Sequence, residues 1–179
     1  MKVGDLNQPQ ETSFILMKRT IQIGLEMRSD WKNTSRVQEG VWNLVNSSLD
    51  DESRADSISM VSAELLENAI KYGDKNQGGN TLIFFNLRGN EDEIIVEVKN
   101  KIHEGADNDI RSLDETIQWI RGYQNPFEAY LERLYSVARA PGGESRMGMF
   151  RMAYEASAIL DFFVNENDEI SVSATIPLK

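Results

Sequence analysis

Two pairs of alternating apolar segments constrain the fold of this chain more than any other feature. The first pair covers residues 81–88 and 93–99 and is separated by Gly-Asn-Glu-Asp. The second pair covers residues 159–164 and 169–176 and is separated by Asn-Glu-Asn-Asp. Alternation with a period of two, bounded by turn residues, predicts two β-hairpins. Because a hairpin pairs its strands antiparallel, we expect a mixed, mainly antiparallel sheet.

Helical periodicity fills most of the remaining chain. Besides short strands at 13–17 and 20–26, the sequence predicts helices at 37–49, 58–73 (with the motif 62–73), 110–121, 127–139 and 146–158. Residues 33–36 supply caps for the first helix, Asp56 or Ser57 for the second, and Gly73 is placed to end the second. The order of hairpins and helices predicts an α+β fold, an α/β sandwich whose sheet is covered on one face by helices.

The helix at 62–73 carries a polar stripe beside an apolar face. Glu64, Asn68 and Lys71 are spaced i, i+4 and i+7, so they lie along one side of the helix. Leu66 and Ile70 point roughly the opposite way from the apolar face, so the helix is expected to be covered on two sides. A solvated edge with an i,i+4 pair is the alternative explanation. Polar groups on a covered helix need partners, which makes the stripe a candidate site.

A glycine-rich segment precedes the last predicted helix. Its sequence, residues 141–152, is Pro-Gly-Gly-Glu-Ser-Arg-Met-Gly-Met-Phe-Arg-Met. Glycines that lead into a helix N-terminus offer exposed N–H groups and a favourable dipole to phosphates. An ordinary loop is the alternative, because glycines serve those as well. Met147, Met149 and Met152 are expected to pack in the core behind this segment.

Composition excludes several classes of function. The 179 residues carry a formal net charge of −10, so the basic field of a nucleic-acid or anionic-membrane binder is missing. The absence of cysteine excludes thiolate metal sites and cysteine nucleophiles, and the single His103 excludes histidine clusters. No leader or membrane span is apparent, so we expect a cytoplasmic protein. One domain at 13–179 is expected after a flexible segment at 1–12.

Glu-Leu-Leu-Glu-Asn-Ala-Ile-Lys-Tyr-Gly, residues 64–73, resembles the asparagine box of the GHKL (Bergerat-fold) ATPases, which include gyrase, Hsp90, histidine kinases and MutL. The segment 142–149 is similar to their second glycine box, and the order of elements from about residue 20 to 176 also fits. The length, and the lack of a phosphoacceptor helix pair, resemble the stand-alone bacterial serine kinases of partner switching. These are the anti-sigma-factor kinases and the related SiaB-type kinases.

The resemblance implies a role for each matching residue. Asn68 would coordinate Mg²⁺ bound to the phosphates of ATP, and Glu64 would be the general base. Lys71 would contact phosphate or pair with Glu67, and Tyr72 would pack near the nucleotide or in the core. The glycine-box residues would close over the phosphates and include one cation: Gly142, Gly143, Arg146, Gly148 and Met149.

The chain departs from the family pattern at the first glycine box. The family has an aspartate in Asp-x-Gly-x-Gly that binds the adenine amine, whereas residues 99–105 here read Lys-Asn-Lys-Ile-His-Glu-Gly. Asn100 is the best stand-in, because its side-chain oxygen accepts a hydrogen bond. Residues 109–139 fall where the family keeps its ATP lid, and their apolar spacing favours an ordinary helical hairpin over a mobile gate.

These observations lead to one principal hypothesis and two alternatives. The first is an ATP- and Mg²⁺-dependent protein serine/threonine kinase whose substrate, by resemblance, is a small STAS-type antagonist protein. The second is a GHKL-like protein-binding module with a degenerate or lost nucleotide site. The third is the ATP-binding component of a histidine-kinase-like system acting on a separate chain. The sequence leaves the oligomeric state open, a homodimer included.

Overall fold

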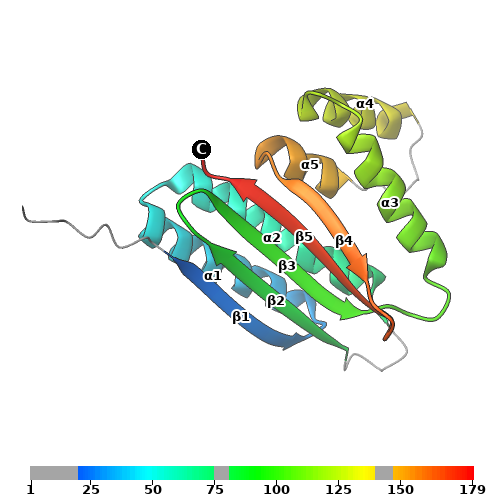
Figure 1. Ribbon diagram of the computed structural model, residues 1–179, viewed down its shortest axis with the longest axis horizontal. Helices are drawn as coiled ribbons and strands as arrows, with labels where there is room; N and C mark the ends of the chain where they lie inside the picture. Colours follow the sequence, from blue (N-terminus) through cyan, green and yellow to red (C-terminus); the bar gives the residue numbers. More distant parts are fainter. Residues whose placement is uncertain (1–19, 75–80, 140–146) are drawn as a thin grey trace, which may run out of the picture.

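Five antiparallel strands form the sheet in the computed structural model, which describes residues 20–74, 81–139 and 147–179. The strands are β1 (Ile21–Arg28), β2 (Leu82–Gly89), β3 (Glu93–Lys101), β4 (Ile159–Val164) and β5 (Glu169–Pro177). Their order is β1-β2-β3-β5-β4 (Figure 1). Both predicted hairpins are confirmed, β2 with β3 and β4 with β5. Every pairing among the described strands is antiparallel, so the parallel component that a mixed sheet implies is not found there.

The central strand β3 shows how the sequence pattern becomes a buried face. Its residues alternate between buried and half-buried, and the buried set runs Ile94, Val96, Val98 and Asn100. An asparagine therefore occupies the last inward position of an otherwise apolar series. Asn100 pairs with Ile83 on β2 and with Ile170 on β5, which places a polar group at one end of the core.

Two long helices begin earlier than the sequence pattern suggests. Helix α1 (Trp31–Leu49) is capped by Asp30, which accepts from the N–H of Lys32 at 2.9 Å. Helix α2 (Glu52–Tyr72) is capped by Asp51, which accepts from the N–H of Arg54 at 3.0 Å. The predicted caps at 33–36 and at Asp56 or Ser57 are therefore wrong. The first turn of each helix is largely exposed and lacks the apolar periodicity on which the prediction depended.

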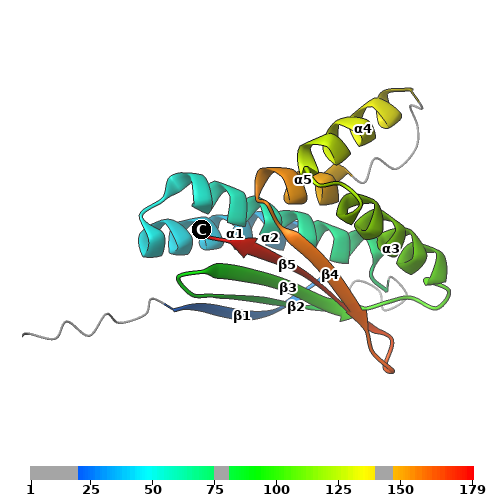
Figure 2. The same ribbon diagram turned by 45° about the horizontal axis from the view of Figure 1, so that its top comes forward.

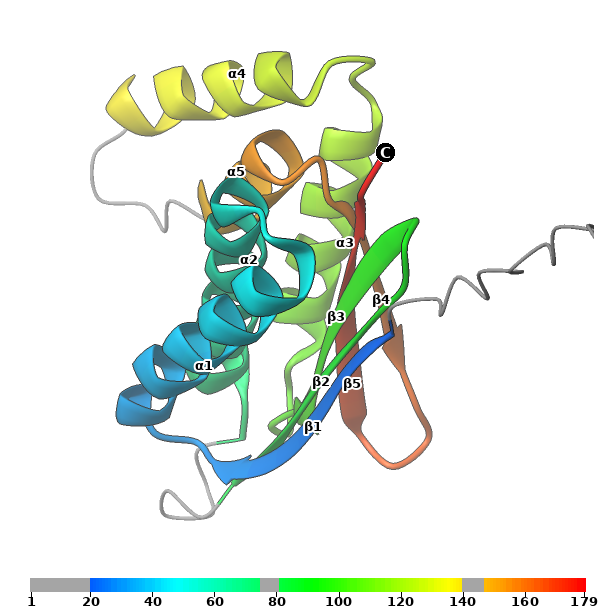
Figure 3. The ribbon, with the colours of Figure 1, turned by 90° about the vertical axis from the view of Figure 1, so that its left-hand side faces the viewer.

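The helices all lie on one face of the sheet, which confirms the predicted α+β class (Figure 2). Helix α2 packs on α1, β3 and α5 (Met147–Glu155), so both sides of it are covered, with Leu65 and Leu66 each 1% exposed. Helices α3 (Asp107–Arg121) and α4 (Pro126–Arg139) form as predicted, but they lie at a wide angle to each other and do not pair as a hairpin; α4 packs on α5 and lies beyond it, away from the sheet (Figure 3).

Aromatic side chains join α3, α4 and α5. Trp119 and Phe150 meet edge to face with ring centroids 5.3 Å apart, and Tyr130 stacks on Tyr154 at 5.4 Å. Of the three methionines predicted to pack in the core, Met149 and Met152 are buried and Met147 is only half-buried. Helices α3 and α4 are thus each packed on α5 through aromatic side chains. The predicted strand at 13–17 and the flexible segment at 1–12 lie outside the described residues.

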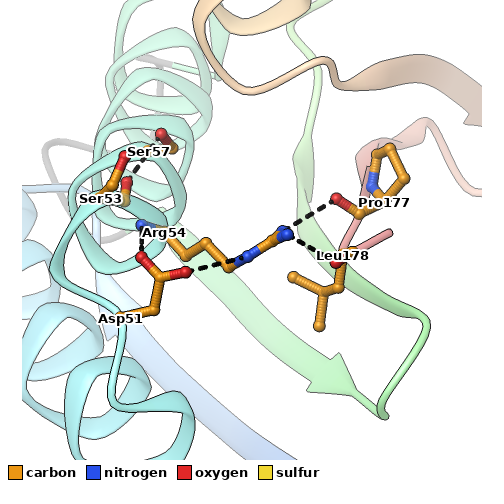
Figure 4. A network of polar contacts seen from close by, with 6 residues as sticks. All are labelled: Asp51, Ser53, Arg54, Ser57, Pro177 and Leu178. Atoms are coloured by element: carbon orange, nitrogen blue, oxygen red, sulfur yellow. Dashed lines mark hydrogen bonds and ion pairs between the residues drawn. The ribbon is translucent and has the colours of Figure 1, made fainter.

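Arg54 ties the start of α2 to the end of the chain (Figure 4). Its guanidinium donates to the carbonyl of Pro177 at 3.3 Å and to that of Leu178, and its Nε lies 3.2 Å from a carboxylate oxygen of Asp51. Two backbone acceptors at the end of β5 therefore depend on one side chain.

Arg54→Ala is expected to lower the stability of the fold modestly. A partly exposed charged donor of this kind contributes about 1 kcal/mol, which corresponds to a Tm about 2–4 °C lower for a domain of this size. Thermal unfolding followed by circular dichroism measures the change. Arg111→Ala, at an exposed position on α3, is the matched control. Equal Tm values for the two variants would contradict the role of Arg54.

Candidate functional site

A pocket of about 80 Å³ opens where α2, α3 and α5 meet the ends of β3 and β5. Five residues predicted from the sequence lie in its lining: Asn68, Tyr72, Asn100, Gly148 and Met149. The other described lining residues are mainly apolar: Leu65, Ala69, Val98, Ile102, Ala106, Asp109, Ile110, Leu113, Ile170 and Val172. A largely apolar pocket with a few polar groups is the usual form of a small-molecule site.

Helix α2 supplies one wall of the pocket. Leu65, Asn68, Ala69 and Tyr72 follow one another at spacings of three, one and three, so they share a face of the helix. Asn68 is half-buried on that face. Lys71 is exposed and is not among the lining residues, and its Nζ lies 5.0 Å from the centre of the Tyr72 ring. The polar stripe thus divides, with Asn68 toward the pocket and Lys71 toward solvent.

Asn100 provides the polar end of the β-strand wall. It is 4% exposed, and its Nδ2 donates to the carbonyl of Lys101 at 2.9 Å. This bond uses a donor of the amide and leaves Oδ1 as the acceptor. Gly73 closes α2 beside it, since a Cβ there would lie 2.5 Å from the Ala69 carbonyl oxygen and 3.0 Å from Asn100 Nδ2. The end of α2 and the end of β3 therefore meet only because residue 73 is glycine.

Glu64 lies one helical turn before Asn68, against the first turn of α5, and is not itself among the lining residues of the pocket. A Cβ at Gly148 would lie 2.0 Å from Glu64 Oε2 and 2.8 Å from its Cδ, so the carboxyl group occupies the space that a side chain there would take. The other carboxyl oxygen, Oε1, lies 3.5 Å from Nη1 of Arg151. Gly148 is thus required by the packing of Glu64, in addition to any contact that its backbone makes with a ligand.

The electrostatics of Glu64 favour a proton acceptor. Burial raises the pKa of its carboxyl group above the ordinary value of 4.5, and the negative charge of Glu67 acts in the same direction. Arg151 opposes the rise, and Glu155 adds to it. A carboxylate whose pKa is raised toward neutrality is a stronger base than an exposed one, and such groups are often found at catalytic sites.

Sequence reasoning missed Arg151 and, although it placed the lid region 109–139 beside the site, named no residue of α3 as a site residue. Arg151 is 87 residues away from Glu64 along the chain, and nothing local signals that the two meet. Asp109, Ile110 and Leu113 at the start of α3 line the pocket, and Asp109 is the one carboxylate among its described lining residues. Their i, i+1, i+4 spacing is the signal that marks one helix face.

Three predicted phosphate-binding residues, Gly142, Gly143 and Arg146, lie outside the described residues. Within the described ranges, no three His, Cys, Asp or Glu side chains gather closely enough to hold a metal ion. In the same part of the chain, no helix has the length and apolarity needed to cross a membrane.

The fold is shared with a solved structure. A chain in the crystal structure of the SiaB–SiaC complex from Pseudomonas aeruginosa matches with a TM-score of 0.64 and 19% identity, over 88% of this chain and 90% of that one. No protein-family model and no curated protein matches the chain. The chain is thus an α+β protein with the fold found in that complex and with a pocket at the end of its sheet.

Proposed function

We propose that the chain is an ATP- and Mg²⁺-dependent protein serine/threonine kinase of the GHKL type that acts in partner switching. One observation carries the proposal: Asn68 and Asn100 line the same apolar pocket, and the carboxyl group of Glu64, one turn before Asn68 on α2, lies against the start of α5. Such a reaction requires a ligand for the cation, a hydrogen-bond acceptor for the adenine ring and a general base for the hydroxyl proton. The amide of Asn68, the amide of Asn100 and the carboxylate of Glu64 are groups of these three kinds.

The β-strand end of the pocket suits an adenine ring. Its apolar side chains offer contact to a flat ring, and Asn100 Oδ1 accepts from an exocyclic amine. Asp109 adds a second acceptor to the same lining. The carboxylate that the family keeps at the strand end is thus replaced by an amide on β3 and a carboxylate on α3.

Asn68 suits Mg²⁺ that is bound mainly by phosphate and water. Mg²⁺ takes oxygen ligands and usually keeps several waters, so one amide oxygen together with nucleotide phosphates forms a reasonable site. The lack of an acidic cluster in the described residues agrees with this division of ligands. When bound, the ion neutralises charge that develops on the transferred phosphoryl group.

Glu64 would accept the proton of the attacking hydroxyl group. As the oxygen of a serine side chain or of water bonds to the γ-phosphorus, the bond from phosphorus to the β–γ bridging oxygen breaks and ADP leaves. The hydroxyl proton passes to a carboxylate oxygen of Glu64, whose raised pKa makes it a stronger proton acceptor than an exposed carboxylate. Met149 and Gly148 then border the reacting end of the pocket.

A protein partner follows from the same proposal. The structurally similar chain comes from a complex of two proteins, SiaB and SiaC. A small antagonist protein is the expected substrate, and its STAS type follows from the family resemblance. The ATP requirement favours the cytoplasm. Nε2 of His103, the single histidine of the chain, lies 3.9 Å from Oδ2 of Asp109. Because His103 lies in a polar segment, nothing marks it as a phosphoacceptor.

A second candidate function is protein binding without phosphate transfer. The observation that favours it is Asn100 in the place of the family's aspartate, because an amide binds an adenine amine without the help of a charge. A chain of this kind would hold its partner through the same fold and leave the pocket empty of nucleotide. Binding of ATP separates the two candidates.

Asn68→Ala is expected to abolish the Mg²⁺-dependent part of ATP binding. Calorimetry with ATP, in the presence and absence of Mg²⁺, measures the heat of binding for each variant. Asn43→Ala, at an exposed asparagine of α1, is the matched control and should bind as the wild type does. Absence of any heat with the wild type at millimolar nucleotide would remove the kinase proposal, and equal Mg²⁺-dependent binding by Asn68→Ala would remove Asn68 as the ligand.

A further inference from the structure

The carboxylate of Glu64 is held from two directions by α5. On one side Oε2 packs against the backbone at Gly148, where a Cβ would come within 2.0 Å. On the other side Oε1 lies 3.5 Å from Nη1 of Arg151. Gly148 and Arg151 are three residues apart on one helix, so a single face of α5 bears on the carboxylate.

Arg151 is itself anchored on α5. Its Nε lies 3.0 Å from Oε1 of Glu155, in an i,i+4 pair along the helix. The guanidinium therefore presents Nε to Glu155 and Nη1 to Glu64, which uses the planar fork of arginine in a fixed orientation. The side chain of Glu64 is 22% exposed, against 45% for Arg151, so the pair lies at the edge of the buried region.

Arg151 differs in charge from the other ionisable groups that act on Glu64. Of the described groups that act on this carboxylate, Glu67 on α2 and Glu155 on α5 are negative and Arg151 is positive. Loss of Arg151 would therefore leave Glu64 among negative neighbours with no counter-charge. Its carboxylate would then be repelled from α5 and would lose the contact that fixes its position.

We propose that Arg151 is a positioning residue that holds the Glu64 carboxylate against the start of α5, and that Glu155 sets the strength of that hold. The role of Arg151 in positioning a general base rests on the proposed kinase function. The contact between Arg151 and the Glu64 carboxylate, called the hold below, does not. A general base must lie within hydrogen-bond reach of the proton that it accepts, so a residue that fixes Glu64 contributes to the rate without touching substrate.

Titration of the full chain without nucleotide tests the hold directly. The side-chain carboxyl carbon of Glu64 is followed by NMR against pH in the wild type, Arg151→Met, Arg151→Lys and Glu155→Gln. Arg151→Met should raise the pKa of Glu64, because the positive neighbour is lost. Glu155→Gln should lower it, because a negative neighbour is lost. Arg151→Lys should stay near the wild type.

Arg28→Met, on the edge strand β1, removes an equal charge far from α5 and should leave the titration of Glu64 unchanged. An unchanged Glu64 titration in Arg151→Met, or a rise in the pKa with Glu155→Gln, would overturn the proposal. The titration needs no catalysis, so it distinguishes failure of the hold from failure of the proposed function.

Turnover of ATP, followed as release of inorganic phosphate with Mg²⁺, gives the functional readout. Arg151→Met is expected to lower kcat about tenfold and to change KM for ATP less than about twofold, because positioning acts on the chemical step. Arg151→Lys should restore most of the rate. Equal losses of kcat in Arg151→Lys and Arg151→Met would refute a role through charge and position. If the pKa of Glu64 shifts as expected but neither the wild type nor any variant turns over ATP, the contact between Arg151 and Glu64 is supported and the kinase proposal is removed.

Discussion

Glu64→Gln is expected to lower ATP turnover by about 10²- to 10⁴-fold, which is the usual contribution of a general base. Glutamine keeps the shape and hydrogen-bonding reach of the side chain, so ATP and Mg²⁺ should bind as they do to the wild type. The packing against Gly148 is retained as well, because the amide occupies the same space. The loss should therefore fall on kcat, with KM for ATP nearly unchanged.

The same variant should be slightly more stable than the wild type at neutral pH. Burial raises the pKa of Glu64 above 4.5, so between that value and the raised one the folded chain binds more protons at this site than the unfolded chain. Stability then falls as pH rises through this window. Glutamine removes that loss of stability, so a gain in Tm is expected above this pH window and none well below pH 4.5.

Phosphate release and thermal unfolding measured side by side check both parts. Glu39→Gln is the control, because it removes the same charge from an exposed position on α1 and Glu39 is not among the groups that shift the pKa of Glu64. A Glu64→Gln chain that turns over ATP at the wild-type rate would show that Glu64 is not the base. A lower Tm for this variant at neutral pH would show that the carboxylate stabilises the fold, contrary to the direction of its pKa.

Gly148→Ala is expected to displace the Glu64 carboxylate and to reduce turnover about 100-fold, as a shift of about 1 Å in a catalytic group can do. The added Cβ would meet Oε2 at 2.0 Å, a distance that forces movement. Because the obstructing atoms are the end of a flexible side chain, Glu64 can move aside while α5 stays in place. Stability should therefore change little, and alanine is the better helix former.

Gly40→Ala on α1 is the matched control, since a Cβ there meets nothing within 4 Å. It should leave turnover unchanged and stabilise the fold by roughly 0.5–1 kcal/mol through helix propensity. Phosphate release and thermal unfolding of both variants provide the comparison. Wild-type turnover in Gly148→Ala would mean that the observed position of Glu64 is unimportant for the reaction.

Much of the fold could be predicted because it depends on local periodicity. The hairpins at β2–β3 and β4–β5, and the helices α3, α4 and α5, begin and end within a few residues of the predicted positions. The predicted starts of α1 and α2 were wrong, because Trp31 and Glu52 begin helices in exposed turns where apolar spacing gives no signal. Their caps, Asp30 and Asp51, are ordinary helix-capping residues.

The candidate site was predictable only along single elements. Asn68 and Tyr72 were found as members of one helix, and Asn100 was found from its place at the end of a strand. These residues line one pocket together with Gly148 and Met149, and their roles stay predictions. Lys71 does not join them, because the face of α2 that it occupies is exposed.

The sequence alone determined the α+β class, both hairpins and the polar stripe of α2, since each depends on residues that are close along the chain. Only the tertiary structure decided that Glu64 lies between Gly148 and Arg151, and that α3 brings Asp109 to the pocket. These contacts join segments separated by tens of residues. The packing that creates them depends on the shapes of whole helices, which no local pattern records.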